Sequence, residues 1–122
     1  MTNDIDMQRK MAEIGSRYLA RTITELGDLQ RMVTQLPTGG NATLKEIEIL
    51  AHRIRGSGAV FGFAKLSDIA GTIEMLAVDS ALIDPRSKMR NDVQLAEQFA
   101  VHLQHLVSET QAAVAAAAAQ KS

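Results

Sequence analysis

One histidine of this chain lies in a setting that suits chemistry. His52 belongs to the stretch 51–62, where apolar residues recur at helical spacing. Successive helical residues lie about 100° apart, so one face must be buried, that of Ile47, Leu50, Ile54 and Phe61. His52 points away from this face. A neutral imidazole is a nucleophile near pH 7, so an outward His52 could accept a transferred group.

The residues around His52 favour phosphoryl chemistry. Five others share its outer face: Lys45, Glu48, Arg55, Gly56 and Ala59. The Arg55 guanidinium could hold phosphoryl oxygens. Gly56 and Gly58 each cost about 1 kcal/mol relative to alanine inside a helix. Gly58 faces the bundle, where a small residue lets helices approach, whereas Gly56 clears space beside His52 for another protein's active site. A histidine alone is more often an ordinary solvated side chain, so this interpretation depends on the whole group.

Length and composition exclude several other functions. The 122 residues fit one domain, and the absence of cysteine removes disulfides and thiolate chemistry. A formal net charge of -1 disfavours a nucleic-acid partner, because duplex binding requires a cationic excess. The sequence contains no apolar run long enough for a membrane span and no signal-peptide pattern. We therefore expect a cytoplasmic protein with no nucleic-acid or membrane partner.

The residue types predict an all-α fold. Only 3% of the residues are aromatic, two are proline, and good helix formers dominate. A helical pattern covers 4–36, with a break expected near Gly15-Ser16 that would separate a short first helix. The segment 37–41 reads as a loop. We expect an antiparallel up-down-up-down four-helix bundle with an additional short N-terminal helix.

Capping signals place the remaining helices. Thr43 and Glu46 form a capping box that opens a helix running to about Phe61, and Gly62 ends it. The next helix covers 65–78. Asp84-Pro85 is expected to open the last one, with aspartate as the cap and proline in the first helical position. The alanine-rich stretch 111–122 is expected to extend that helix without burying anything.

The spacing of these residues resembles a known family signature within 51–74. It consists of His52-x-x-Arg55-Gly56-Ser57 followed by Phe61-Gly62, Leu66, Ala70 and Ile73-Glu74. This pattern is similar to that of histidine phosphotransfer (HPt) domains. The resemblance implies that 1–122 is a single stand-alone HPt domain, the carrier of a two-component phosphorelay.

The same resemblance implies a role for each site residue. His52 would accept a phosphoryl group from a receiver-domain aspartate and pass it to another receiver. Arg55 occupies the family's basic position, which is more often lysine. Glu74 would accept a hydrogen bond from the inner ring nitrogen of His52; the alternative is an ordinary solvated glutamate. The receiver-binding surface would comprise Arg53, Gly56, Ala59, Val60, Phe63 and Lys65.

The resemblance also implies the partners of the domain. These are response-regulator receivers and a hybrid histidine kinase, with the protein itself a monomer. The chain has no phosphate-binding loop of the Gly-x-x-x-x-Gly-Lys-[Ser/Thr] type, so we expect a phosphocarrier without kinase activity. No cofactor is expected, since the magnesium ion would belong to the receiver.

Two other functions remain open from the sequence. One is a non-catalytic helical module that only binds partners. The other is a metal-binding bundle using His102 and His105, a His-x-x-His pair that could supply half a site. Di-iron bundles use Glu-x-x-His pairs on two helices, and the sequence contains none. We expect both histidines to be surface or flanking residues.

Overall fold

The described part of the chain is built from helices. The computed structural model describes residues 2–121, with the side chains of 4–119. It contains α1 (Thr2–Val60), α2 (Ala64–Ala81) and α3 (Asp92–Lys121), and no strand occurs among the described residues. The predicted all-α class is therefore confirmed. No helix in this range is both long and apolar enough to cross a membrane.

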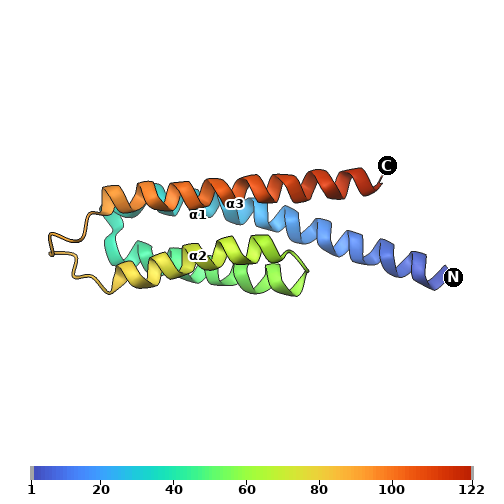
Figure 1. Ribbon diagram of the computed structural model, residues 1–122, viewed down its shortest axis with the longest axis horizontal. Helices are drawn as coiled ribbons and strands as arrows, with labels where there is room; N and C mark the ends of the chain where they lie inside the picture. Colours follow the sequence, from blue (N-terminus) through green and yellow to red (C-terminus); the bar gives the residue numbers. More distant parts are fainter. Residues whose placement is uncertain (1, 122) are drawn as a thin grey trace.

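Helix α1 doubles back on itself at Gly40 (Figure 1). Gly40 has φ 59° and ψ −139°, a left-handed backbone conformation that favours glycine. At Gly39 an added Cβ would clash with Oγ1 of the buried Thr43, so glycine is needed there for space. We call residues 2–39 the outgoing arm and residues 41–60 the returning arm. The loop predicted for 37–41 is thus reduced to one non-helical residue.

The expected break near Gly15-Ser16 is absent, and that prediction was wrong. The only non-helical backbone within α1 is at Gly40, so the outgoing arm is continuous and no separate short N-terminal helix exists. A Cβ on Gly15 would lie 3.8 Å from Cζ of Phe63. The aromatic ring packs on the glycine, and this contact offsets its low helix propensity.

The returning arm ends in a Schellman motif. The Gly62 N–H donates to the Ala59 carbonyl at 3.3 Å, and the Phe63 N–H donates to the Gly58 carbonyl at 2.7 Å. Gly62 has φ 84°, the left-handed conformation that this motif requires. The predicted stop at Gly62 is confirmed, and α2 begins at Ala64, directly after it. We call residues 60–63 the hairpin tip.

The start of α3 differs from the prediction. Asp84 and Pro85 lie in the connection between α2 and α3, where Oδ1 of Asp84 accepts a hydrogen bond from the Arg86 N–H at 2.9 Å and forms a local turn. The helix begins instead at Asp92, because Oδ1 of Asn91 accepts the Gln94 N–H at 3.0 Å.

A buried arginine, Arg90, joins the α2–α3 connection to the bundle by hydrogen bonds. The side chain of Arg90 is only 3% exposed. Its Nη1 donates to the carbonyls of Ser80 and Ile83 at 3.2 and 2.9 Å, and its Nη2 donates to Oδ1 of Asn41 at 2.8 Å. Its Nε pairs with Asp92. Arg90 therefore joins the end of α2, the start of α3 and the residue after the reversal.

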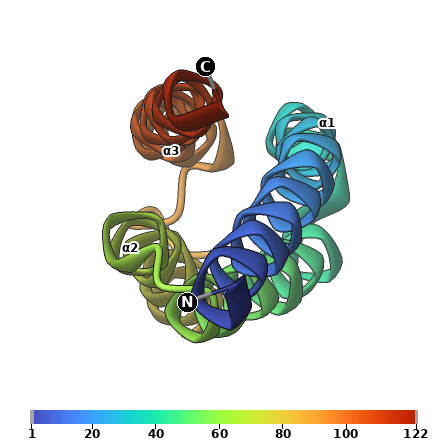
Figure 2. The ribbon, with the colours of Figure 1, turned by 90° about the vertical axis from the view of Figure 1, so that its right-hand side faces the viewer.

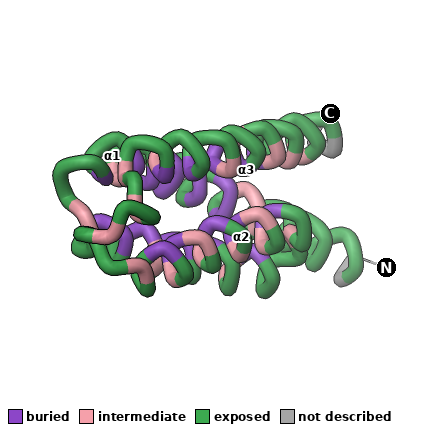
Figure 3. The backbone as a smooth tube through the Cα atoms, turned by 60° about the vertical axis from the view of Figure 1, so that its left-hand side comes forward, coloured by how far each residue is buried: buried purple, intermediate pink, exposed green. Residues whose placement is uncertain are grey.

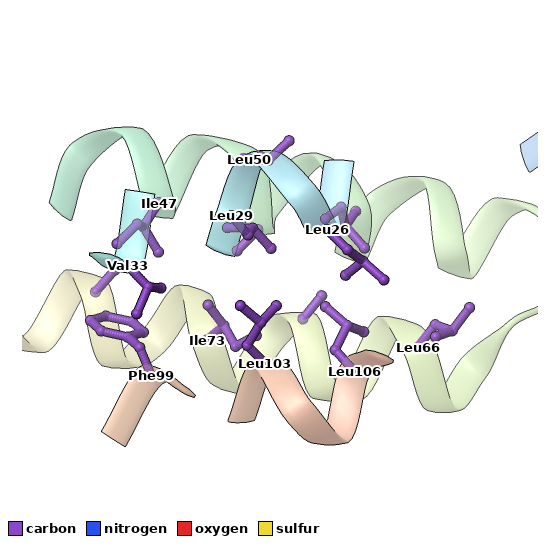
Figure 4. Close-up of a cluster of buried hydrophobic side chains, with 14 of the residues drawn as sticks. Leu26, Leu29, Val33, Ile47, Leu50, Leu66, Ile73, Phe99, Leu103 and Leu106 are labelled. Atoms are coloured by element: carbon purple, nitrogen blue, oxygen red, sulfur yellow. The ribbon is translucent and has the colours of Figure 1, made fainter. Parts of the chain in front are cut away.

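Apolar side chains from both arms, α2 and α3 converge on one core (Figure 4). Figure 2 shows these helices viewed from one end of the bundle. Burial follows the inward side of each helix (Figure 3). Ile47, Leu50 and Ile54 are buried as predicted, whereas Phe61 is 39% exposed because it lies at the hairpin tip. The alanine-rich end of α3 also packs, since Ala113 and Ala117 contact the core. The expectation that this stretch buries nothing was therefore wrong.

Candidate functional site

His52 of the returning arm and Glu74 of α2 are hydrogen-bonded across the helix interface. Nδ1 of His52 lies 2.7 Å from Oε2 of Glu74. The histidine side chain is 64% exposed and the glutamate side chain 13%. A carboxylate only accepts hydrogen bonds, so Nδ1 carries the ring proton and donates it. The Nε2 atom is then the nitrogen with a free lone pair, on the exposed side of the ring.

Arg55 approaches the same carboxylate from the side. Its Nε lies 3.1 Å from Oε1 of Glu74, an ion pair, but Oε1 has no partner with hydrogen-bond geometry among the described residues. The Arg55 side chain is about half-exposed. Its terminal nitrogens are therefore available to a second anion beside His52.

Two residues of α2 position Arg55, and the sequence analysis did not single them out. Gly71 faces the arginine stem, because a Cβ there would lie 3.2 Å from Cδ of Arg55. The Ser67 hydroxyl donates to the Arg55 carbonyl at 2.8 Å. Both also line a shallow depression of about 430 Å³ with Arg55, Asp68, Thr72 and Met75. A glycine on α2, three residues before Glu74, was the signal available in the sequence.

The two glycines that follow His52 have different surroundings. A Cβ on Gly56 would meet nothing within 4 Å, so the absence of a side chain serves no packing purpose within the described protein. A Cβ on Gly58 would lie 3.1 Å from the Tyr18 hydroxyl and 3.2 Å from the Ser67 nitrogen. Gly58 therefore allows close helix packing, and Gly56 leaves an open surface beside His52.

The other predicted receiver-binding residues are spread over the returning arm, the hairpin tip and the start of α2. Ala59, Val60 and Lys65 are exposed. Phe63 is half-buried, because its ring stacks on Tyr18 with the centroids 5.2 Å apart. Arg53 is directed toward the outgoing arm.

Arg53 lies opposite a buried carboxylate, that of Glu25. Nη1 of Arg53 is 3.8 Å from Oε2 of Glu25, and Nε of Arg21 is 3.8 Å from Oε1. The Glu25 side chain is 8% exposed, and Oε1 has no hydrogen-bond partner within the described part of the chain. Desolvation by burial raises the pKa of Glu25 above its usual 4.5, and the two arginines oppose this only in part.

His102 and His105 of α3 form an edge-to-face ring pair with centroids 6.4 Å apart. Among the described residues there is no group of three or more histidine, aspartate and glutamate side chains that could hold a metal ion. Nothing in the geometry thus adds a ligand to this pair.

The fold and the site define a class of protein, an all-helical bundle that presents one exposed histidine supported by a carboxylate and flanked by a cation. The family model of the Hpt domain matches residues 17–119, so the chain belongs to the histidine phosphotransfer domain family. Members of this family act as phosphotransfer carriers in phosphorelays, where they interact with receiver domains and kinases. No significant match was found among the curated proteins or the solved structures.

Proposed function

We propose that this protein carries a phosphoryl group on Nε2 of His52, taking it from the aspartyl phosphate of one receiver domain and giving it to the aspartate of another. The hydrogen bond between Nδ1 of His52 and Glu74 carries the proposal, because it leaves Nε2 as the exposed nucleophile. A hydrogen-bonded carboxylate also holds the ring in one orientation, as behind other catalytic imidazoles.

In the proposed transfer, the bond that forms at His52 replaces the bond that breaks at the receiver aspartate. The Nε2 lone pair attacks phosphorus, the N–P bond forms, and the P–O bond to the receiver aspartate breaks, so the aspartate leaves as a carboxylate. The ring keeps its Nδ1 proton and becomes positively charged. The Glu74 carboxylate at 2.7 Å stabilises that charge. The return transfer reverses each change.

Arg55 and Gly56 serve the incoming partner in this proposal. The terminal nitrogens of Arg55 neutralise charge on the phosphoryl oxygens, while its Nε stays beside Glu74. The open surface at Gly56 admits the receiver to the distance that in-line transfer requires. The receiver contributes its own magnesium ion and acidic residues. The rim of the contact comprises Arg53, Ala59, Val60, Phe63 and Lys65.

We further propose that the working unit is a cytoplasmic monomer. In it the two arms of α1 with α2 and α3 form a four-helix bundle. The Gly40 reversal and the Arg90 contacts support this arrangement, since both fix neighbouring helices in antiparallel order.

Transfer from a phosphorylated receiver tests the proposal. The protein is incubated with magnesium and each phosphorylated receiver encoded in the same genome, and acid-labile, base-stable phosphate is then measured. We expect labelling of the wild type and of the matched control His102→Ala, and none of His52→Ala. Labelling that persists in His52→Ala, or the absence of transfer from every receiver, contradicts the proposal.

A further inference from the structure

The outgoing arm of α1 extends past the hairpin tip, and the described backbone of this extension is coloured as exposed (Figures 1 and 3). Met7, Met11 and Ile14 are 63%, 66% and 46% exposed. They lie on one helix face, because their spacing of four and three residues is that of a seam between packed helices. We call these three residues the arm seam.

The arm seam is the first part of a longer stripe. The same spacing continues through Tyr18, Thr22, Glu25 and Leu29, all of which are buried. The returning arm covers this second part, where the Tyr18 hydroxyl donates to the Ile54 carbonyl at 3.5 Å and Glu25 faces Arg53. One stripe thus packs on a helix along its second part, whereas the side chains of its first part are exposed and no described helix covers them. A second helix at the arm seam would complete the same packing.

The edges of the arm seam indicate the charge of that helix. Lys10 and Arg17 lie along one edge of the arm seam, which we call the outer edge, and both are exposed. Neither forms an ion pair with any described side chain. The opposite, inner edge is the one nearer Phe63. Gln8 and Gly15 follow the inner edge, and Gly15 is already in contact with Phe63. A helix with acidic residues along one side would pair with the cationic edge.

We infer that the arm seam binds an acidic amphipathic helix of a partner protein. A second copy of this chain fits less well. In an antiparallel pair Lys10 and Arg17 would face Arg17 and Lys10 of the other copy, and in a parallel pair Lys10 would face the neutral Gly15. Self-association therefore gains no ion pair. Phe61 of the hairpin tip is 39% exposed, and its ring centroid lies 5.0 Å from that of Tyr18, so it adds apolar surface where the arm seam meets the covered part of the stripe.

Two synthetic helical peptides test the inference. Both have leucine at four-three spacing, one with glutamate and the other with lysine along the flanks. Fluorescence anisotropy measures their binding to the full chain. We expect the glutamate peptide to bind roughly tenfold more tightly than the lysine peptide. Met11→Asp should abolish that binding, whereas Met89→Asp, a change at an 83% exposed methionine of the α2–α3 connection, should leave it unchanged.

A charge reversal and a histidine variant separate this inference from the proposed phosphotransfer. Lys10→Glu combined with Arg17→Glu should reverse the peptide preference. His52→Ala should bind the glutamate peptide like the wild type, because the arm seam acts without the imidazole. Equal affinity for the two peptides, no binding of either, or binding that survives Met11→Asp overturns the inference. So does a dimer, measured by light scattering, that Met11→Asp dissociates.

Discussion

The inner ring nitrogen of His52 lies 2.7 Å from the carboxylate of Glu74, a residue 22 positions later on the next helix. The register between the returning arm and α2 sets this distance, and the Schellman motif at Gly62 sets the register. The site therefore depends on the hairpin tip as well as on the two side chains themselves.

Substitutions of Glu74 should distinguish its two proposed effects on His52, which are holding the ring in one orientation and stabilising its positive charge. In Glu74→Gln the amide oxygen still accepts a hydrogen bond from Nδ1–H of His52. The neutral amide does not stabilise the positive charge of the phosphorylated ring, so we expect a moderate loss of transfer rate. Glu74→Ala removes both effects and should lower the rate by at least about tenfold. The transfer rate should therefore fall from the wild type to Glu74→Gln and again to Glu74→Ala. Single-turnover transfer from a phosphorylated receiver measures the three rates. Equal rates in the wild type and Glu74→Ala would show that the contact is not used in transfer.

Gly56 and Gly58 should respond in opposite ways to alanine. Gly56→Ala should stabilise the fold by about 0.5–1 kcal/mol, because the new methyl meets open space and improves helix propensity. Gly58→Ala should destabilise it by about 1–3 kcal/mol, since the Cβ meets backbone atoms of Ser67 and Phe63. Urea unfolding measures both.

A larger side chain at Gly56 tests the docking surface. Gly56→Gln should block transfer from a receiver while the bundle stays folded. The matched control is Gly27→Gln, because a Cβ on Gly27 also meets nothing within 4 Å but lies on the outgoing arm. We expect normal transfer by the control. Unfolding of Gly56→Gln would instead assign this glycine to internal packing.

Substitution of Gly71 should act through Arg55. In Gly71→Val the added methyl groups occupy the space of the Arg55 stem, which a Cβ alone would approach to 3.2 Å. The guanidinium should leave Glu74, and transfer should slow without loss of the fold. If displacement of the guanidinium is the cause, Gly71→Val should slow transfer little further in an Arg55→Ala background. Equal slowing in both backgrounds would contradict this explanation.

Glu25 should make stability depend on pH. Its pKa is raised in the folded state by burial, so the folded protein binds more protons than the unfolded chain between pH 4.5 and the raised pKa. The contribution of Glu25 to stability is therefore fully present below pH 4.5 and is lost as pH rises through the folded pKa. Glu25→Gln lacks this titration. Unfolding free energies of the two proteins should diverge in favour of the variant as pH rises, and parallel curves would contradict the assignment.

Removal of Arg90 should be costly because the side chain is buried. Arg90→Ala leaves Asp92 without its cation and removes the arginine donor from the Ile83 carbonyl, whereas the Ser80 carbonyl keeps the Ile83 N–H; we expect a loss of about 3–5 kcal/mol. Arg86→Ala is the control, since that side chain is 91% exposed and pairs only with Asp84, and its effect should stay within about 0.5 kcal/mol. Thermal unfolding compares the two.

Local signals in the sequence were sufficient for much of the fold. The helical class, the stop at Gly62 and the buried face of Ile47, Leu50 and Ile54 each follow from nearby residues. The errors have two causes: a distant contact changed the local preference at Gly15, and a competing local hydrogen bond prevailed at Asp84. Gly15 remains helical because Phe63 packs on it. Asp84-Pro85, which was predicted to open α3, forms a turn instead, and Asn91 caps the helix.

The site residues also divide into those that one helix predicts and those that depend on packing between two helices. The outward position of His52 and the open surface at Gly56 follow from helix geometry alone. The contact of Arg55 with Glu74, and the role of Gly71 in it, depend on the rotation of α2 against the returning arm. One helix's periodicity does not specify that rotation.

The reversal at Gly40 fixes the position of His52 along the bundle. Because a single non-helical residue joins the two arms, the chain there has no slack to absorb a change in length. His52 follows Gly40 by twelve residues, which places it about 18 Å along the bundle. One residue inserted between them would turn the imidazole by about 100° around the helix and carry it away from α2. The number of residues between Gly40 and His52 therefore cannot change without separating His52 from Glu74.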